Sequence, residues 1–369
     1  ITSCTKEVKT KATLLDQLPP NPSLIVKINN LTNFKSEVKN NPFLEKMKGF
    51  SNLSEILNKL KGLESLSTES TCLLALYEVG KDNYDFVLIT KKTPDLFNLE
   101  DVGNKTVETL TYQNTKITKY GLDAISIFSL SREKEIVFSS SNLLMENMVR
   151  TQEANPMDPT LKKLYEATSP NKSATFFINL ATSPSVLSMA KEAGENSSPL
   201  AEWVSLDFTA NSDEVNLNGI AMAPDSTKNF INLFKGTTPL TNKTPLFSPL
   251  NAQAIVSYTF DDYQVFAKNQ NAYLDRIKPV DTLFNTIEEI GIIYLNNKKA
   301  VLLNSYGTES LYHYMDTHKT GSETYQGSEI MALPDKQFIV SSFNPLVQDF
   351  ESNYCTILEN SFIYSYDKE

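Results

Sequence analysis

The chain has few of the residues from which catalytic and metal sites are most often built. It contains 3 cysteines, 2 histidines and 12 glycines among 369 residues. Cys4, Cys72 and Cys355 show no CxxC spacing, and His313 and His318 are five positions apart, so the closely grouped ligands of a zinc site are missing. No GxSxG, GxxxxGK[ST], GxGxxG or HExxH motif occurs. The sequence therefore predicts no metal site and no cofactor.

Long apolar runs and an excess of positive charge are also absent. The formal net charge is −10 at pH 7, and both signs are scattered along the chain. Such a surface repels phosphate backbones, which excludes nucleic acid as an expected partner. No apolar run approaches the roughly 20 residues that a membrane-spanning helix needs, so no span across a bilayer is expected.

Two of the cysteines lie in patterns typical of buried side chains. Cys72 belongs to the apolar run TCLLALYEV, and Cys355 lies in a later strand-like run. Cysteine behaves as a small apolar residue in such surroundings. An oxidising compartment would permit a disulfide between the two, and their spacing leaves that pairing open.

One stretch of the chain is similar to another much later in the chain. Residues 18–44, LPPNPSLIVKINNLTNFKSEVKNNPFL, align without gaps with residues 248–274, SPLNAQAIVSYTFDDYQVFAKNQNAYL. The identical pairs are Pro19/Pro249, Asn21/Asn251, Ile25/Ile255, Val26/Val256, Asn41/Asn271 and Leu44/Leu274. A proline-containing loop, a short run of branched residues and an amphipathic run are typical of loop, strand and helix. Two copies of one structural unit are the simplest interpretation.

The patterns along the rest of the chain extend this unit into an α+β fold. The first strand is followed by helices to residue 66, which Asn41-Pro42 should interrupt because proline suits the first position of a new helix. Strands are then expected at residues 72–79, 84–91, 107–112, 115–120, 124–130 and 135–140. Helices are expected at 142–151, 183–193 and 227–234, and later strands at 174–180, 203–210, 214–223, 290–295, 300–305, 354–358 and 361–366. The predicted fold class is therefore α+β, in tandem repeated units that each place a strand and helices before an antiparallel meander sheet.

The predicted domain organisation has five parts. Residues 1–13 form a lipobox remnant and tether, residues 14–154 the first α+β unit, and residues 155–235 a middle α+β segment that completes or repeats the first. Residues 236–245, rich in Thr and Pro, form a linker, and residues 246–369 form the second copy of the unit. Because the closing helix of the first unit has no counterpart before residue 369, we expect the second copy to be truncated at its C-terminus.

The first four residues, ITSC, resemble the end of a bacterial lipoprotein signal peptide, in which an aliphatic residue and two small residues precede the lipidated cysteine. The polar residues 5–13, TKEVKTKAT, would then act as a tether of about 30 Å when extended. Lipid chains contribute about 0.8 kcal/mol per buried methylene, so acylation of Cys4 would hold a folded body at a membrane. The alternative is an unmodified cysteine near the end of a fragment.

Two acidic pairs are the first candidates for catalysis. Asp261 and Asp262 fall between the strand and the helix of the second copy, where aspartate caps the exposed amides of a helix. We therefore interpret them as caps. Glu288 and Glu289 lie between a helical run and a strand, and we expect them to be solvated because no other residues converge with them on a site.

The two histidines fall in LYHYMDTHKT, residues 311–320. His313 has Asp316 close to it in sequence as an orienting partner, but no nucleophile accompanies the pair. We expect this segment to be an exposed aromatic and polar loop.

The N-terminal features together resemble a known family. The motif ITSC, the short polar tether and LPPNPSLIVKINNLTNFKSEVKNNPFL are similar to the start of uncharacterised cell-envelope lipoproteins of Bacteroidota, a domain of unknown function with repeated α+β units. That family offers no catalytic residues to transfer to this chain. The resemblance implies a signal peptide upstream, lipidation of Cys4 and a place in the cell envelope, in the outer membrane and facing the periplasm or the cell surface.

The leading functional hypothesis is a non-enzymatic, lipid-anchored binding or scaffold module for envelope proteins or glycans. The missing catalytic set favours it. One alternative is an envelope hydrolase that uses Asp261, Asp262 or His313. Another is a stalk that carries further C-terminal domains.

Overall fold

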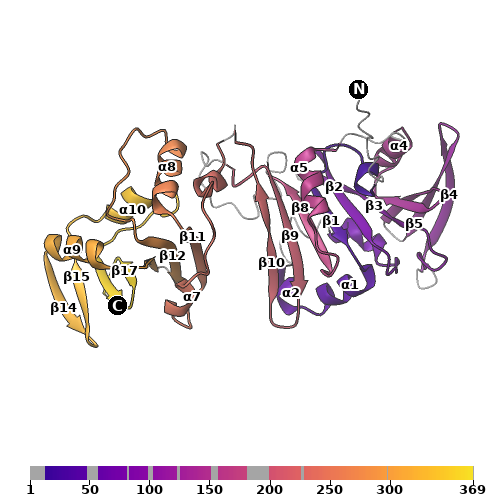
Figure 1. Ribbon diagram of the computed structural model, residues 1–369. Coiled ribbons are helices and arrows are strands. Elements are labelled where there is room, and N and C mark those ends of the chain that lie inside the picture. Colours follow the sequence, from indigo (N-terminus) through magenta and orange to yellow (C-terminus); the bar gives the residue numbers. More distant parts are fainter. Residues whose placement is uncertain are drawn as a thin grey trace, which may run out of the picture. The chain divides into compact units, whose positions relative to one another are not determined.

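The computed structural model describes residues 13–47, 57–80, 83–98, 103–122, 125–150, 157–180, 199–225, 228–296 and 298–368. The chain separates into two compact units, Ile1–Asn229 (unit 1) and Phe230–Glu369 (unit 2). Each unit is a mixed α+β structure built on one open antiparallel sheet (Figure 1). Cys4 and the helix expected at 183–193 lie outside the described residues.

Unit 1 contains a ten-stranded sheet in the order β10-β9-β8-β1-β2-β3-β7-β6-β5-β4, with every neighbouring pair antiparallel. Its strands are β1 (Leu24–Ile28), β2 (Cys72–Gly80), β3 (Asn83–Lys91), β4 (Lys105–Tyr112), β5 (Thr115–Leu122), β6 (Ile125–Ser131), β7 (Glu135–Ser139), β8 (Ala174–Asn179), β9 (Trp203–Ala210) and β10 (Val215–Met222). Strands β8 to β10, from the middle segment of the chain, continue the sheet from the edge of β1.

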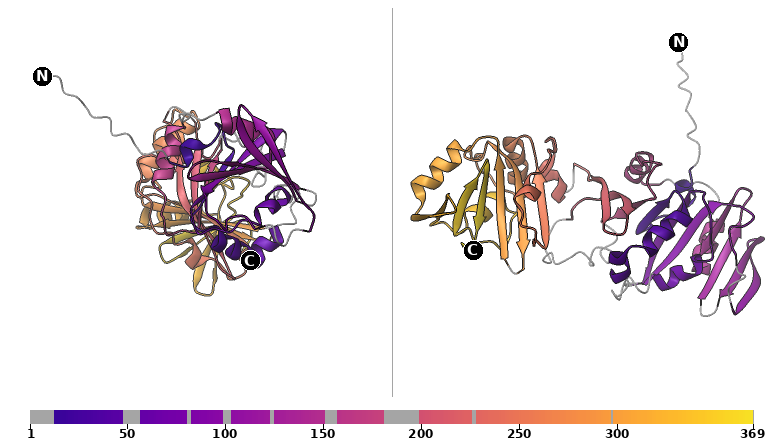
Figure 2. Two further views of the ribbon diagram at one scale, coloured as in Figure 1. Left: turned by 90° about the vertical axis from the view of Figure 1, so that its right-hand side faces the viewer. Right: turned by 90° about the horizontal axis from the view of Figure 1, so that it is seen from below.

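Helices cover both faces of this sheet. The helices of the first face are α1 (Leu31–Lys39), α2 (Pro42–Met47) and the 3-10 turn η2 (Lys61–Leu63), and those of the second face are α4 (Asn142–Arg150), α5 (Pro159–Glu166) and the 3-10 turn η1 (Leu15–Gln17). Successive strand residues point to opposite faces, so Val26 packs with Leu31 of α1 while Ile25 packs with Met145 of α4. Figure 2 shows these layers in two further views.

The break between α1 and α2 has a local cause. α2 begins at Pro42, whose ring suits the first helical position, and the Asn41 side chain accepts a hydrogen bond from the amide of Leu44 at 2.9 Å. The same buried side chain donates to the carbonyls of Asn211 (2.5 Å) and Glu214 (3.2 Å), next to the β9–β10 turn. The predicted interruption at Asn41-Pro42 is confirmed.

Unit 2 contains a seven-stranded sheet in the order β11-β12-β13-β17-β16-β15-β14. Its strands are β11 (Ala254–Thr259), β12 (Ile287–Leu295), β13 (Lys298–Ser305), β14 (Gly321–Tyr325), β15 (Ser328–Ala332), β16 (Tyr354–Leu358) and β17 (Ser361–Ser365). Its helices are η3 (Phe230–Phe234), α7 (Thr244–Phe247), α8 (Tyr263–Tyr273), α9 (Glu309–His318) and α10 (Phe338–Phe343).

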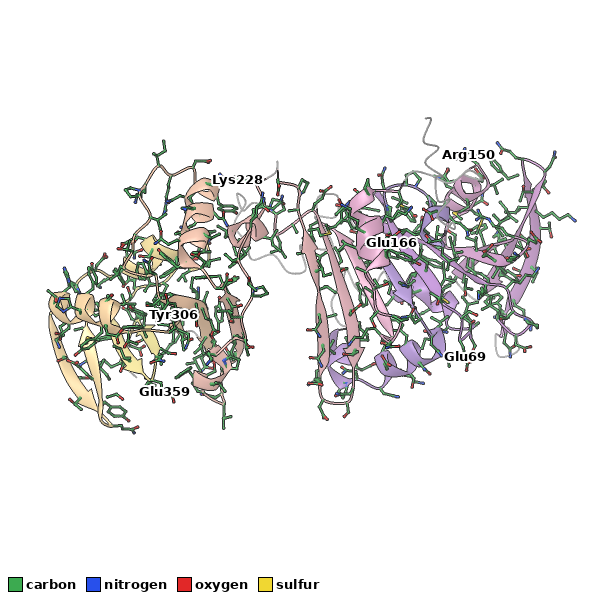
Figure 3. All side chains as sticks on the ribbon, in the orientation of Figure 1. Glu69, Arg150, Glu166, Lys228, Tyr306 and Glu359 are labelled. Atoms are coloured by element: carbon green, nitrogen blue, oxygen red, sulfur yellow. The ribbon has the colours of Figure 1, made fainter. Side chains whose placement is uncertain are left out.

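The core of unit 2 is rich in aromatic residues. Phe266 of α8 stacks on Phe260 at 4.6 Å between ring centroids, and Phe284 meets Phe343 of α10 edge-on at 4.9 Å. Aromatic side chains bury a large apolar area each and dominate such cores. Figure 3 draws the side chains of both units as sticks, with Tyr306 and Glu359 labelled in unit 2.

The two sheets share an order of strands. The run β1-β2-β3-β7-β6-β5-β4 in unit 1 and the run β11-β12-β13-β17-β16-β15-β14 in unit 2 follow the chain in the same sequence, and all neighbours are antiparallel in both. The last hairpin of each run also turns in the same way, because Gln113 after β4 and Gln326 after β14 both have positive φ, 45° and 49°.

The predicted strands are confirmed within one to three residues at their ends. Two features differ. The expected helix at 227–234 is the short 3-10 turn η3, and the division between units falls after Asn229 rather than within residues 236–245. Those residues run beside β11 and α8 of unit 2: the amide of Thr238 donates to Asp261 at 2.7 Å, and the amide of Leu240 donates to the hydroxyl of Thr259 at 3.0 Å.

Candidate functional site

The carboxylates of Asp261 and Asp262 accept hydrogen bonds from backbone amides. Asp262 is the N-cap of α8 and accepts from the amides of Gln264 (2.8 Å) and Val265 (3.2 Å), which confirms the predicted cap. Asp261 accepts from the amide of Thr238, and this hydrogen bond lowers the pKa of the Asp261 carboxyl. Each carboxylate is thus committed to a backbone N–H, as expected at a helix start.

Glu289 corrects the prediction that the second acidic pair is solvated. It lies within β12 and is 1% exposed. Its carboxylate accepts four hydrogen bonds, from the amide of Lys243 (2.5 Å), the amide and hydroxyl of Thr244 (3.0 and 2.5 Å) and the hydroxyl of Ser257 (2.7 Å). A buried carboxylate needs such donors, because desolvation without them is costly. Glu289 therefore holds the start of α7 against the sheet.

Gly291 allows Thr244 to pack closely against β12. A Cβ atom added at Gly291, two residues further along β12, would lie 2.0 Å from the Thr244 hydroxyl oxygen. Residues two positions apart in a strand point to the same face, so Glu289 and Gly291 together form the surface on which Thr244 packs. This arrangement is structural rather than catalytic.

The histidines also correct a prediction. His313 and His318 lie in helix α9 and not in a loop, because Leu311 and Met315 are buried one turn apart and bring the segment onto the core. Both imidazoles are on the exposed side. His318 stacks on Tyr314 at 4.2 Å between ring centroids.

Cys72 and Cys355 are free and buried, as predicted from their apolar surroundings. Burial raises the pKa of the Cys72 thiol to about 11 and that of the Cys355 thiol to about 12. Thiols in this state are poor nucleophiles, because the thiolate is the reactive form.

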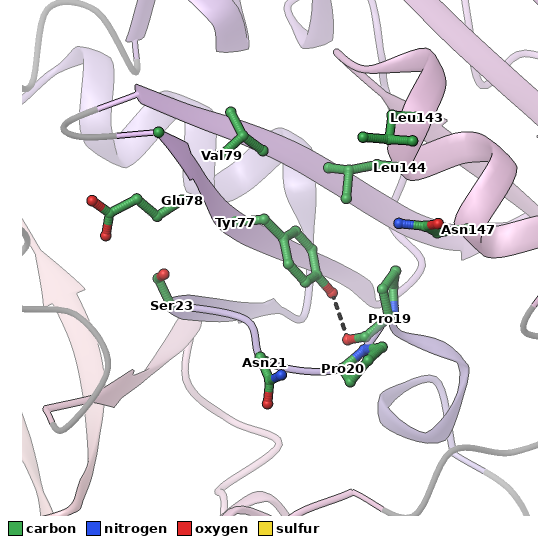
Figure 4. A pocket seen from close by; sticks show the side chains of 11 residues that line it. Pro19, Pro20, Asn21, Ser23, Tyr77, Glu78, Val79, Leu143, Leu144 and Asn147 are labelled. Atoms are coloured by element: carbon green, nitrogen blue, oxygen red, sulfur yellow. Dashed lines mark hydrogen bonds between the residues drawn. The ribbon is translucent and has the colours of Figure 1, made fainter.

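Unit 1 has a cavity of about 590 Å³ where the chain enters β1 (Figure 4). The Tyr77 hydroxyl donates to the carbonyl of Pro19 at 2.9 Å, and burial raises the pKa of Tyr77 well above its ordinary value. Leu143 of α4 and Val79 of β2 line the cavity and are 61% and 46% exposed. The cavity thus has a polar floor and an apolar mouth.

Unit 2 has a larger cavity, of about 1230 Å³, which we call the unit 2 cavity. Half-buried Ile330, Thr356 and Ile363 line it on β15, β16 and β17. Ion pairs at its rim join Lys298 to Asp367 (3.0 Å), Lys368 to Glu323 (2.7 Å) and Glu351 to Lys336 (3.7 Å). The Lys368 ammonium also lies 5.5 Å from the ring centroid of Tyr354. The arrangement offers apolar contact within a charged border of both signs.

Residues at aligned positions of stretches 18–44 and 248–274 line the two cavities. Pro19 and Asn21 line the first, and their counterparts in the repeated stretch, Pro249 and Asn251, line the second. Each cavity also adjoins the end of its unit's first hairpin, β2–β3 or β12–β13. Helix α4 lines one side of the cavity in unit 1 through Leu143, Leu144 and Asn147, whereas the helix that reaches the unit 2 cavity is α10, through Val340. Neither cavity was predicted from the sequence, although the Pro-x-Asn shared by the two stretches marks their positions.

Comparison with protein-family models, with curated proteins and with solved structures finds no match for this chain. In the part of the chain that the structure describes, no group of three or more His, Cys, Asp or Glu side chains is placed to hold a metal ion. The helices in that same part are too short or too polar to cross a bilayer.

Proposed function

We propose that the chain is a non-enzymatic binding protein of a bacterial cell envelope, held at a membrane by lipid on Cys4, and that its cavities receive segments of protein partners. The observation that carries this proposal is the cavity at the equivalent place in each unit. A site that recurs with its Pro-x-Asn lining is better explained by shared use than by chance packing.

Duplication of one α+β unit belongs to the same proposal. Three observations support it: the gap-free likeness of residues 18–44 and 248–274, the common order of seven strands, and the positive-φ glutamines at corresponding hairpins. Two related units on one chain offer two related binding sites, which raises the effective concentration of the second once the first is filled.

Helix α4, which lies beside the unit 1 cavity, indicates what kind of segment the unit 2 cavity binds. In unit 1 the amphipathic helix α4 lies there, with Leu144, Met145 and Met148 buried and Leu143 exposed. In unit 2 the half-buried floor of Ile330 and Ile363 is open within its charged rim. An amphipathic helix of a partner, with its apolar face on this floor, matches that shape and chemistry.

Site-specific photo-crosslinking in native envelopes tests the binding site. A photoreactive residue at Thr356, on the cavity floor, should capture a discrete protein, and Ile363→Arg in the same chain should abolish the product by filling the floor with a charged side chain. A photoreactive residue at Leu246, which is 78% exposed and outside the cavity lining, is the matched control. Equal capture at both positions would contradict the proposal.

The anchor is tested separately. Wild-type protein expressed with a lipoprotein signal peptide should fractionate with membranes and incorporate labelled fatty acid, and a Cys4→Ala variant should do neither. If the Cys4→Ala variant stays in the membrane fraction, the proposed lipid anchor is refuted. That result would not bear on the proposed binding site in the cavity.

A further inference from the structure

Strand β11 forms one edge of the unit 2 sheet, and its sequence is unusual for a free edge. The residues AIVSYT contain no charge, no proline and no glycine. Proteins protect free edges with such residues, because an unpaired row of N–H and C=O groups invites another strand. The edge strands β4 and β14 carry charged side chains (Lys105, Glu108 and Glu323), and the edge strand β10 contains Gly219. β10 and β11 are thus the two of these four edge strands without charge or proline, and β11 also lacks the glycine that weakens a strand interior.

Unit 1 shows what lies at the same place in the related sheet. There β1, the counterpart of β11, pairs antiparallel with β8, so that Val26 is opposite Phe176 and Ile25 is opposite Phe177. The pairing joins two three-stranded meanders, β1-β2-β3 and β8-β9-β10, through their first strands. A two-fold axis normal to the sheet approximately relates the two meanders, because residues 24–28 run against residues 178–174 with Val26 and Phe176 at the centre.

The backbone of β11 is oriented for the same pairing. The amide of Asn29 donates to Ser173 next to β8, so odd-numbered residues of β1 face β8. The amide of Phe260, next to β11, donates to the carbonyl of Glu288 in β12, so even-numbered residues of β11 face β12 and the amides of Ile255 and Ser257 point to the free edge. Near this edge, Thr259 exchanges hydrogen bonds with the backbone of Leu240 through its hydroxyl and not through its amide.

We propose that β11 is a homodimerisation strand: two copies of the chain pair antiparallel through β11, with Val256 opposite Val256 of the second copy. The result is one continuous sheet in which β11-β12-β13 of each copy meet as β1-β2-β3 and β8-β9-β10 meet in unit 1. An isologous contact of this kind closes on itself and gives a dimer rather than a filament. The absence of charge on β11 means that no like charges face each other across the two-fold axis.

Disulfide trapping tests the register in a Cys4→Ala background. Val256 faces itself in a non-hydrogen-bonded pair with Cα atoms about 4.5 Å apart, which suits a disulfide. Val256→Cys should therefore give covalent dimers under mild oxidation. Ala254→Cys is the matched control, because Ala254 would face Tyr258 and not itself. Buried Cys72 and Cys355 do not compete. No covalent dimer from Val256→Cys, or equal yields from the two variants, would overturn the proposal.

Sedimentation equilibrium of the full chain provides the second measurement. Wild-type protein should be a dimer, and Ile255→Pro, which removes an outward N–H that β12 does not use, should be a monomer. Ile255→Thr keeps the N–H and should remain a dimer. A monomeric wild type, or a dimeric Ile255→Pro with native circular dichroism, would refute the inference. If Ile255→Pro does not fold, the disulfide comparison decides alone.

Discussion

The buried carboxylate of Glu289 should contribute strongly to the stability of unit 2. In Glu289→Gln the amide oxygen can keep the three hydrogen bonds from Thr244 and Ser257, but the amide NH2 group faces the N–H of Lys243. Hydrogen bonds to a charged group contribute about 1.5–3 kcal/mol and neutral ones about 0.5–1.5. Neutralising three bonds, at about 1–1.5 kcal/mol each, and losing the fourth, at about 1.5–3 kcal/mol, should therefore lower the free energy of unfolding of unit 2 by about 4.5–7.5 kcal/mol, less the smaller desolvation cost of the neutral amide.

The single tryptophan makes this measurement selective. Trp203 is buried in unit 1, so its fluorescence follows the unfolding of that unit alone, while far-ultraviolet circular dichroism follows both units. In urea, Glu289→Gln should lower the midpoint of the unit 2 transition, which appears in the dichroism and not in the fluorescence. The fluorescence midpoint, which reports unit 1, should not change. Glu288→Gln, the same change one residue earlier, should alter stability by no more than about 0.5 kcal/mol. Equal shifts from both variants, or a shifted fluorescence midpoint for Glu289→Gln, would refute the reasoning.

Three further outcomes are expected. Asp158→Ala removes the N-cap of α5 and the acceptor of the Trp203 indole N–H (3.3 Å), so unit 1 should lose about 1–2 kcal/mol and the Trp203 emission maximum should move. Gly291→Ala places a methyl group against the Thr244 side chain, which is hydrogen-bonded to Glu289. It should lower the free energy of unfolding of unit 2 by about 1–3 kcal/mol, measured by the same dichroism transition. Burial raises the pKa values of Cys72 and Cys355 to about 11 and about 12, above the ordinary value of 9.0, so the folded state keeps protons that the unfolded state loses. The free energy of unfolding should therefore fall as pH rises above 9.0. Cys72→Ala and Cys355→Ala should each make this fall smaller.

Local features of this protein were predictable because their causes are local. The cap at Asp262, the break at Asn41-Pro42 and the hairpin between β2 and β3 each depend on residues within a few positions of one another. Strand alternation has the same character, and it placed Ile25 and Val26 on opposite faces of β1.

The errors have physical reasons too. The segment of α9 looked like a loop because tyrosines and histidines interrupt its pattern, although Leu311 and Met315, four positions apart, carry the helical signal. Glu289 looked solvated because a glutamate beside another glutamate usually is. Its burial depends on donors from residues 243, 244 and 257, which lie more than thirty positions away along the chain.

The cavities illustrate the division between the two kinds of information. The repeated Pro-x-Asn was visible in the sequence, but the closure of the unit 1 cavity by α4 and the wider space at the counterpart position in unit 2 emerged from packing between distant segments.

The α+β class, the strands other than β14 and β15, the caps at Asn41 and Asp262 and the likeness of residues 18–44 to residues 248–274 could be predicted from the sequence, because side-chain periodicity and capping act over a few residues. The tertiary structure alone decided which strands are neighbours, that β8 pairs with β1, that β11 is an edge, and that Glu289 is buried. Those outcomes depend on backbone hydrogen bonds between segments far apart in the chain, and backbone groups are nearly the same in every residue, so no short stretch of sequence specifies its partner.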